Sequence, residues 1–345
     1  MRRIGFHDRD KEMKEIRDIL DAEPSLITFV YGPINSGKTA LITHLIEELP
    51  EDYVVFYVNL RGKFISNYDD FVRALFKLDR EKKEYKEILR TISEVSLKSL
   101  KFTGIPVTEG VLDLFFKEKT YDDVFEFLED YFTEIAKNKV PVLIVDELQK
   151  IGDVRINTHL IYELFNLFIR LTKELHLCHV FAVTSDSLFI EQVYSEAMLE
   201  GRCRYLMVDD FDYETAAAFL DGHDFTDDER TIAWGYCGGK PVCLLELMNT
   251  KDDRKGKAEE MFKIRKGQIE EVIYSLEAND KKMFDAVLGI LSEFIVSEKT
   301  TYKYLNDEIK FLVRKNIIFA DSVNKELVPQ SQLTLSAMRE VMRDV

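Results

Sequence analysis

The stretch that decides the fold is Leu26-Ile-Thr-Phe-Val-Tyr31, followed at once by Gly32-Pro-Ile-Asn-Ser-Gly-Lys-Thr39. The first six residues are apolar or β-branched and predict a buried strand. The next eight have the spacing G-x-x-x-x-G-K-[ST], and an amphipathic helical pattern continues to Ile46. A strand, a glycine-bounded loop and a helix in this order predict a loop that wraps its backbone N–H groups around a phosphate.

The residue types in this loop suit an anion. Gly32 and Gly37 can adopt backbone angles that a Cβ forbids, so consecutive N–H groups can curl around one phosphate. The helix that begins near Gly37 directs the positive end of its dipole at the same phosphates. We expect Lys38 to reach the β- and γ-phosphates and the Thr39 hydroxyl to bind Mg²⁺. The other loop residues assigned to the nucleotide site are Pro33, Ile34, Asn35 and Ser36.

A second apolar run, Val140-Pro-Val-Leu-Ile-Val145, leads directly into Asp146 and Glu147. It predicts a buried strand that ends in two carboxylates. In an open parallel α/β sheet, ligands bind at the carboxyl ends of the strands. We therefore expect Asp146 to hold the Mg²⁺ shell and Glu147 to orient or deprotonate an attacking water.

Two further features each have two interpretations. Thr184 and Ser185 end the apolar run Val180–Val183; they either contact the γ-phosphate or its water, or cap the helix that follows. Arg202 and Arg204 precede a short predicted strand. One of them either stabilises charge at the γ-phosphate, within its own chain or across subunits, or is a surface arginine.

The bulk composition describes a globular protein of several domains. A chain of 345 residues with 46% hydrophobic residues is expected to form two or three domains. No apolar run approaches the length needed to cross a bilayer, and Met1-Arg-Arg-Ile-Gly5 does not lead into a signal segment, so we expect a cytoplasmic protein. The cysteines are scattered without a C-x-x-C pair, which indicates small buried side chains rather than disulfides or a metal site. They are Cys178, Cys203, Cys237 and Cys243.

The net charge of −16 is unevenly distributed. Residues 251–345 carry equal numbers of basic and acidic side chains, so the whole excess lies in residues 1–250. An acidic body repels the phosphate backbone and argues against non-specific nucleic-acid binding. The neutral C-terminal part leaves a local contact with DNA open.

The rest of the chain is predicted to be mostly helical. Residues 69–138 read as several helices with a turn at Gly104-Ile-Pro106, and residues 213–248 as a small helical lid broken at Gly238–Pro241. A charged helix or linker follows, and then three helices and a β-hairpin, an order that suggests a winged helix. The predicted domains are a core at 1–210 with an insertion at about 69–138, a lid and linker at 211–278, and a winged-helix-like domain at 279–345.

These features resemble the archaeal ATPase family of P-loop proteins, which is related to the AAA+ and STAND NTPases. The resemblance implies an α/β fold in which a parallel-sheet P-loop core carries a small helical lid and a C-terminal winged-helix-like domain. It also implies ATP as the nucleotide, with Phe6, Arg9 and Pro241 near the adenine. The motifs that carry it, from residue 6 to about 330, are Phe6-x-Asp-Arg-x-x-Glu12, Gly32–Thr39, Asp146-Glu147-Leu-Gln149, Thr184-Ser185, Gly201-Arg202 and Gly238-Gly-x-Pro241.

The function expected first is an Mg²⁺-dependent, ATP-driven switch or slow ATPase. The lid would close on the γ-phosphate and reposition the winged helix. Water would attack in line with help from Glu147, while Lys38 and Mg²⁺ offset the developing charge. A protein partner and an oligomeric state are both left open by the sequence.

The alternative is a nucleotide-gated DNA-binding regulator or scaffold with little intrinsic ATPase activity. The expected recognition helix carries Lys310, Arg314 and Lys315, which Asp307 and Glu308 offset. Three basic residues beside two acids neutralise few phosphates. Packing of the winged helix on the lid or on a partner protein is therefore favoured over DNA.

Overall fold

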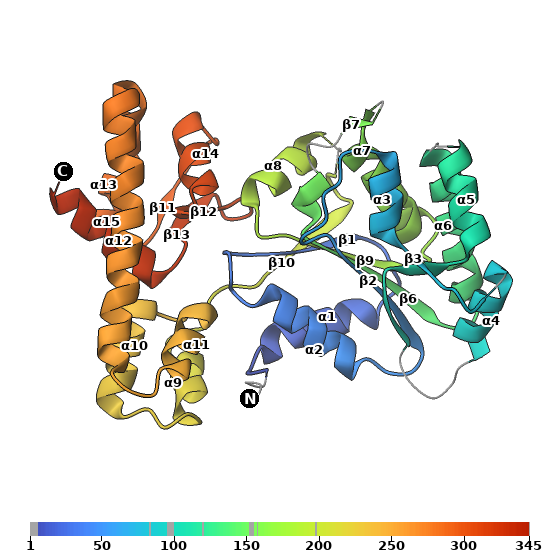
Figure 1. The fold of residues 1–345 in the computed structure, drawn as a ribbon, viewed down its shortest axis with the longest axis horizontal. Coiled ribbons are helices and arrows are strands. Elements are labelled where there is room, and N and C mark those ends of the chain that lie inside the picture. The colour runs from blue at the N-terminus through green and yellow to red at the C-terminus, as the bar shows by residue number, and fades with distance from the viewer. Residues whose placement is uncertain are drawn as a thin grey trace.

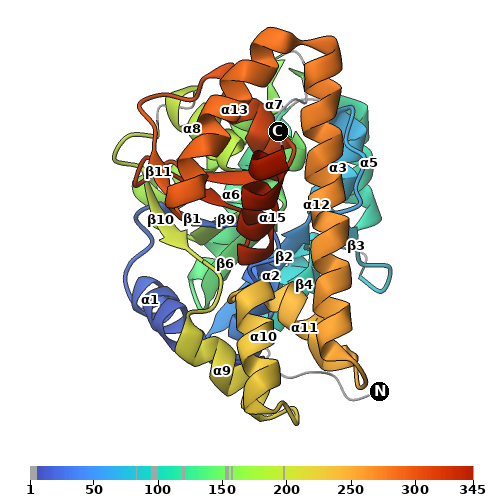
Figure 2. The same cartoon turned by 90° about the vertical axis from the view of Figure 1, so that its left-hand side faces the viewer.

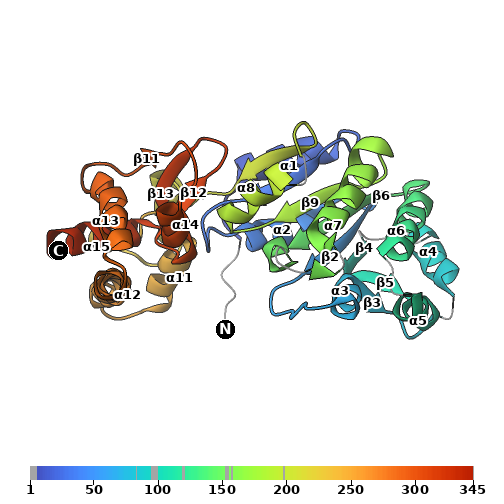
Figure 3. The same cartoon turned by 90° about the horizontal axis from the view of Figure 1, so that it is seen from above.

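The structure, a computed structural model, describes residues 6–82, 84–94, 100–118, 121–151, 155–156, 158–196 and 199–344. An α/β core carries a helical insertion at one end and the C-terminal elements at the other (Figures 1 and 3). A small group of helices lies below the C-terminal elements in the view of Figure 1.

The core is built on a six-stranded sheet in the order β10-β1-β9-β6-β2-β4, and every pairing in it is parallel. All the carboxyl ends therefore meet at one edge. The phosphate loop follows β1 and the two acids end β6, and only β9 separates these strands. The strands are β1 (Ile27–Tyr31), β2 (Tyr53–Asn59), β4 (Leu100–Thr103), β6 (Val140–Asp146), β9 (His179–Val183) and β10 (Cys203–Met207).

Helices cover both faces of the sheet because successive strand residues point to opposite sides. Phe29 and Tyr31 pack with one hydrophobic cluster, and Val30 between them packs with the other. Helices α1 (Asp10–Leu20) and α2 (Lys38–Glu48) cover the face of Val30. The opposite face is covered by α3 (Tyr68–Leu75), α6 (Tyr121–Ala136), α7 (Leu160–Ile169) and α8 (Ser187–Glu196) (Figure 1).

The insertion contains strands that the sequence did not predict. Besides α4 (Tyr85–Glu94) and α5 (Glu109–Glu118), it holds β3 (Phe76–Leu78), β5 (Ile105–Val107) and the sheet strand β4. The expected turn is confined to Gly104, whose φ is 91°, and the next three residues already form β5. Strands of three or four residues carry too little periodic pattern to be recognised, because pairing with neighbours decides them.

The lid helices, α9 (Tyr213–Asp221), α10 (Asp227–Cys237) and α11 (Pro241–Asn249), lie where the sequence predicts them. Helix α10 begins with a capping box between Thr226 and Glu229. The predicted charged linker is the helix α12 (Arg254–Asn279), which runs beside α10 at one end and α15 at the other (Figure 2). Its Ala258 packs with the lid helices, whereas Ile269 and Ile273 pack with the C-terminal elements.

The C-terminal elements contain the predicted hairpin and an additional helix. Two helices precede the hairpin after residue 279, not three, and a short strand lies between them. The helix that ends the chain was not predicted. These elements are α13 (Lys281–Val296), β11 (Thr300–Thr301), α14 (Asp307–Arg314), β12 (Ile318–Asp321), β13 (Glu326–Pro329) and α15 (Gln332–Asp344), with an antiparallel sheet in the order β11-β13-β12.

The hairpin docks on the core close to the phosphate loop. The Tyr31 hydroxyl, at the end of β1, donates to Asp321 Oδ1 at 3.1 Å, and the Tyr31 ring lies against Phe319. On the exposed side, Lys325 Nζ lies 2.8 Å from the carboxylate of Glu191 on α8. The C-terminal elements are thus attached to the strand that leads into the loop.

Candidate functional site

The phosphate loop requires glycine at both of its fixed positions. A Cβ on Gly32 would lie 2.2 Å from the backbone oxygen of Val208, which cannot move aside without displacing the chain. Gly37 has a φ of 98°, in the left-handed region, and it directly precedes the first residue of α2. The predicted strand, loop and helix are all present.

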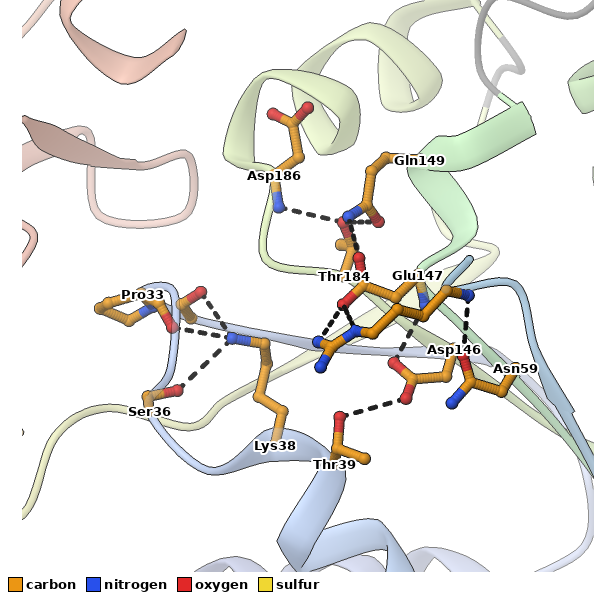
Figure 4. A network of polar contacts seen from close by, with 12 residues as sticks. Pro33, Ser36, Lys38, Thr39, Asn59, Asp146, Glu147, Gln149, Thr184 and Asp186 are labelled. Carbon is orange, nitrogen blue, oxygen red and sulfur yellow. Dashed lines mark hydrogen bonds and ion pairs between the residues drawn. The ribbon is translucent and has the colours of Figure 1, made fainter. Parts of the chain in front are cut away.

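Lys38 is buried inside this loop. Its ammonium donates to the carbonyl oxygens of Gly32 at 3.0 Å and Pro33 at 2.8 Å (Figure 4). Burial, and then the positive charge of nearby Lys240, lower the pKa of Lys38 to about 8. The charged end of Lys38 thus lies among backbone oxygens at the carboxyl edge of the sheet.

Thr39 and Asp146, which are 107 positions apart in the sequence, are brought together by the sheet. The Thr39 hydroxyl donates to Asp146 Oδ2 at 3.1 Å (Figure 4). The Tyr57 hydroxyl donates to the same oxygen at 2.7 Å. The backbone N–H of Glu147 donates to the other oxygen, Oδ1, at 3.0 Å. A hydroxyl beside a buried carboxylate is a pair of hard oxygen ligands and fits Mg²⁺.

Glu147 lies at the same edge with both carboxylate oxygens engaged. Its backbone has a φ of 62°, which turns the chain sharply at the end of β6. Oε1 accepts from the Arg61 guanidinium at 2.5 Å and Oε2 from the Gln149 amide at 2.9 Å. Arg61 lies two residues beyond β2 and was not predicted from the sequence.

Thr184 extends this network to β9. Its hydroxyl donates to Gln149 Oε1 at 2.7 Å and accepts from the backbone N–H of Asp186 at 3.1 Å. Asp186, not Thr184 or Ser185, accepts from the first backbone N–H groups of α8 and serves as its cap. The capping interpretation of the hydroxyl pair is therefore wrong, and Ser185 lines the polar cavity described next.

Two adjoining cavities lie against the loop and share Gly37, Thr39, Ala40, Pro241 and Leu245. The polar cavity, about 240 Å³, is lined by loop residues, the lid residue Val242 and the acidic network. Its polar and charged lining side chains are Asn35, Lys38, Thr39, Arg61, Asp146, Glu147, Thr184 and Ser185.

The apolar cavity, about 520 Å³, contains all three residues that the family resemblance places near adenine. Phe6 stacks on His44 with ring centroids 4.0 Å apart, and Pro241 forms part of the lid wall. Arg9 donates to the carbonyl oxygens of Ser36 and Asp209, each at 2.7 Å, so its guanidinium supports the loop from outside.

Arg202 does not lie at this site. It directly precedes β10, and its carbonyl accepts from the N–H of Ile27, the first residue of β1. The phosphate loop begins at the other end of β1, about 16 Å away for a five-residue strand. The prediction that Arg202 acts within its own chain is wrong, and its action across subunits stays a prediction. Arg204 lies at the same distant edge, where it donates to Ser25.

The cysteines match their prediction as small side chains. All four are free thiols; Cys178, Cys237 and Cys243 are buried and Cys203 is half-buried. Among the described residues, no three His, Cys, Asp or Glu side chains gather as a metal site. Within the same residues, no helix is both long and apolar enough to span a bilayer.

Comparisons with known proteins find relatives along almost the whole chain. Residues 6–247 match the family model described as an ATPase domain predominantly from Archaea, and residues 255–342 match the model for the C-terminal domain of MJ1010-like ATP-binding proteins. The chain is 47% identical to Uncharacterized ATP-binding protein MJ1659 of Methanocaldococcus jannaschii, over 99% of this chain and 98% of that protein. It is 45% identical to Uncharacterized ATP-binding protein PYRAB09480 of Pyrococcus abyssi, over 98% of each.

A solved structure shows the same fold along the whole chain. The Walker-type ATPase paby2304 of Pyrococcus abyssi superposes with a TM-score of 0.65 at 16% identity, covering 97% of this chain and 96% of that one. At this identity the likeness concerns the fold alone. The matching family model and the two relatives show that this chain belongs to the family of ATPase domains found predominantly in Archaea.

Proposed function

We propose that this chain binds Mg-ATP at the phosphate loop and hydrolyses it slowly, as a molecular switch. The observation that carries the proposal is the meeting of three groups at one sheet edge. They are the Lys38 ammonium, the Thr39–Asp146 pair and the Glu147 carboxylate, and all of them line the polar cavity. The names of the relatives, which are ATP-binding proteins, support ATP as the nucleotide.

The loop and its metal ligands would bind the phosphates. Lys38 would exchange its neutral carbonyl partners for charged phosphate oxygens, which are stronger acceptors. Thr39 and Asp146 would hold Mg²⁺ through their oxygens, and the ion would offset charge on the phosphates. The start of α2 adds the positive end of its dipole.

Glu147 would orient the attacking water and accept its proton. The carboxylate is 13% exposed and already bonded to Arg61 and Gln149. Oε2 keeps a lone pair for the proton, but because Arg61 and Gln149 hold the carboxylate in place, we expect slow turnover while it turns toward the water. The Thr184–Gln149 bond would hold this network to β9.

The adenine would occupy the apolar cavity. Phe6 and Pro241 offer apolar surface to the base, and Arg9 holds the wall between base and phosphates through Ser36. The cavity adjoins the polar one at Gly37 and Thr39, so one nucleotide can reach both.

The chain would divide by function at residues 210 and 278. Residues 1–210 would bind and hydrolyse the nucleotide, 211–278 would respond to it, and the winged-helix-like part at 279–345 would present the response to a protein partner. In an oligomer, Arg202 would act only if the nucleotide bound to a neighbouring subunit lay beside it.

The proposal is tested by a pair of variants and matched surface controls. Lys38→Ala should abolish Mg-ATP binding in calorimetry, whereas Glu147→Gln should bind Mg-ATP but lose phosphate release. Lys137→Ala and Glu134→Gln alter an exposed ion pair at the C-terminal end of α6 and should match the wild type. Unchanged phosphate release by Glu147→Gln contradicts the role of Glu147, and unchanged binding by Lys38→Ala contradicts the site.

A further inference from the structure

One residue of the phosphate loop is held by two distant parts of the chain. The Ile34 N–H donates to the side-chain oxygen of Gln330 at 3.1 Å. The Ile34 carbonyl accepts from the ammonium of Lys240 at 3.0 Å. Gln330 belongs to the C-terminal elements and Lys240 to the turn before the lid helix α11.

Gln330 presents its oxygen from a rigid position. It lies in the short link between β13 and α15, and only 5% of its surface is exposed. Its side-chain nitrogen donates to the carbonyl of Ile318 at 3.1 Å, and its backbone N–H donates to the carbonyl of Ile317, also at 3.1 Å. Since the side-chain nitrogen and the backbone N–H of Gln330 are both bound to the chain at the start of β12, its side-chain oxygen moves with the C-terminal elements.

The side chain of Lys240 is likewise fixed, in the turn before α11. It is buried, and its ammonium also lies 2.8 Å from the carboxylate of Asp210. Gly239 allows this position, because a Cβ there would lie 1.6 Å from the backbone oxygen of Phe211. Gly238, with a φ of 56°, lies against Gln332 at the start of α15, so the lid and the C-terminal elements meet beside Ile34.

These two contacts orient consecutive peptide planes of the loop. Gln330 holds the plane between Pro33 and Ile34, and Lys240 holds the plane between Ile34 and Asn35. In a trans peptide the N–H points opposite to the carbonyl, so Lys240 also determines where the Asn35 N–H points. Ile34 and Asn35 line the polar cavity together with Glu147, not the apolar one.

We propose that Gln330 and Lys240 are positioning residues that preset the phosphate loop for the terminal phosphate of ATP. Docking of the lid and the C-terminal elements then determines how well the loop binds ATP, and to a smaller degree ADP. The inference rests on the proposed nucleotide binding. The inference also changes the expected route by which the nucleotide state reaches the C-terminal elements, because these elements contact the loop directly and not only through the lid.

The first test replaces Gln330 with methionine, which has a similar length and no acceptor for the Ile34 N–H. Tyr31→Phe is the matched control, since it removes the bond to Asp321 at the same docking surface without touching Ile34. Calorimetry with the slowly hydrolysed analogue Mg-ATPγS and with Mg-ADP should show that Gln330→Met weakens ATPγS binding about three- to tenfold, as loss of one hydrogen bond predicts. ADP binding should weaken less, and Tyr31→Phe should keep the wild-type ratio of the two affinities.

The second test applies to Lys240 and does not depend on the folding of the first variant. Lys240→Met removes both the Ile34 contact and the ion pair, whereas Asp210→Asn removes the ion pair alone. Lys240→Met should lower the ratio of ATPγS to ADP affinity, and Asp210→Asn should leave that ratio near the wild-type value.

Several outcomes would overturn the inference while leaving the proposed function standing. They are wild-type or tighter ATPγS binding by Gln330→Met, an equal loss in Tyr31→Phe, and equal changes in Lys240→Met and Asp210→Asn. If the wild-type protein itself binds neither nucleotide, the proposed function fails first, and the result is distinguishable from failure of the positioning role.

Discussion

The guanidinium of Arg61 lies 2.5 Å from the carboxylate of Glu147, and the two come from neighbouring strands of the sheet. Asn59, the last residue of β2, pairs in register with Asp146, so residues just beyond each strand meet at the carboxyl edge. Arg61 is 65% exposed and lines the polar cavity. It holds one oxygen of the proposed base and contributes positive charge to the cavity.

These two effects predict that Arg61→Gln raises both kcat and the KM for Mg-ATP. Without the guanidinium, one oxygen of Glu147 is released and the carboxylate can turn toward the water more easily, so kcat should rise about two- to fivefold, the scale of one exposed ion pair. The KM for Mg-ATP should rise because the cavity loses a positive charge. Steady-state phosphate release over a range of ATP concentrations measures both. A fall in kcat would instead assign Arg61 to stabilising charge on the phosphates.

The buried Lys38 predicts that nucleotide binding weakens in mildly alkaline solution. Its pKa is lowered from 10.5 to about 8, chiefly by burial, and only the ammonium form attracts phosphate. Between pH 7 and pH 9 the charged fraction of Lys38 falls about tenfold, so Mg-ADP affinity measured by calorimetry should fall by about the same factor. An affinity that stays constant over this range contradicts the prediction.

The free energy of unfolding of the nucleotide-free protein should increase with pH, whereas the nucleotide affinity decreases. Between pH 8 and 10.5 the unfolded chain binds a proton at Lys38 that the folded chain has lost, so the free energy of unfolding rises with pH. Lys38→Met should lack this rise. Urea unfolding of both proteins at several pH values isolates the difference, and parallel curves would show that Lys38 titrates normally.

The phosphate loop and the acids of β6 were predictable because their chemistry is local. Gly32 and Gly37 are required by backbone geometry within eight residues, and a strand that ends in carboxylates places them at a known edge of a parallel sheet. Arg61 also lies just beyond the carboxyl end of a strand, but its ion pair with Glu147 depends on β2 lying beside β6. No pattern in the sequence states that strand order.

The contacts of the loop with the rest of the chain could not be predicted. Gln330 reaches Ile34 across 296 positions of sequence, and its residue type has no special meaning in a turn after a strand. The prediction that Arg202 acts at the nucleotide site of its own chain was wrong for a related reason. A short strand can place its first residue at either edge of the sheet, and only the parallel pairing of β10 with β1 reveals which.

Two lid glycines that lie four positions apart should respond in opposite ways to alanine. Gly239→Ala brings a Cβ onto the Phe211 backbone, so it should lower the free energy of unfolding by about 3 kcal/mol. Gly235 is an exposed position inside α10 with open space around it, and Gly235→Ala should raise the free energy by about 0.5–1 kcal/mol. Urea unfolding measures both, and similar values for the two variants would show that the lid turn tolerates a side chain.

The C-terminal elements should not retard duplex DNA in a gel-shift experiment at physiological salt. Helix α14, the expected recognition helix, packs against α8 of the core and begins with Asp307 and Glu308. A recognition helix must enter the major groove between two phosphate backbones, and the two acids repel those phosphates. A retarded band that weakens steeply with salt and is lost in Arg314→Ala would contradict this and favour the regulator hypothesis. Absence of a shift with and without Mg-ATP would leave a protein partner as the recipient of the switch.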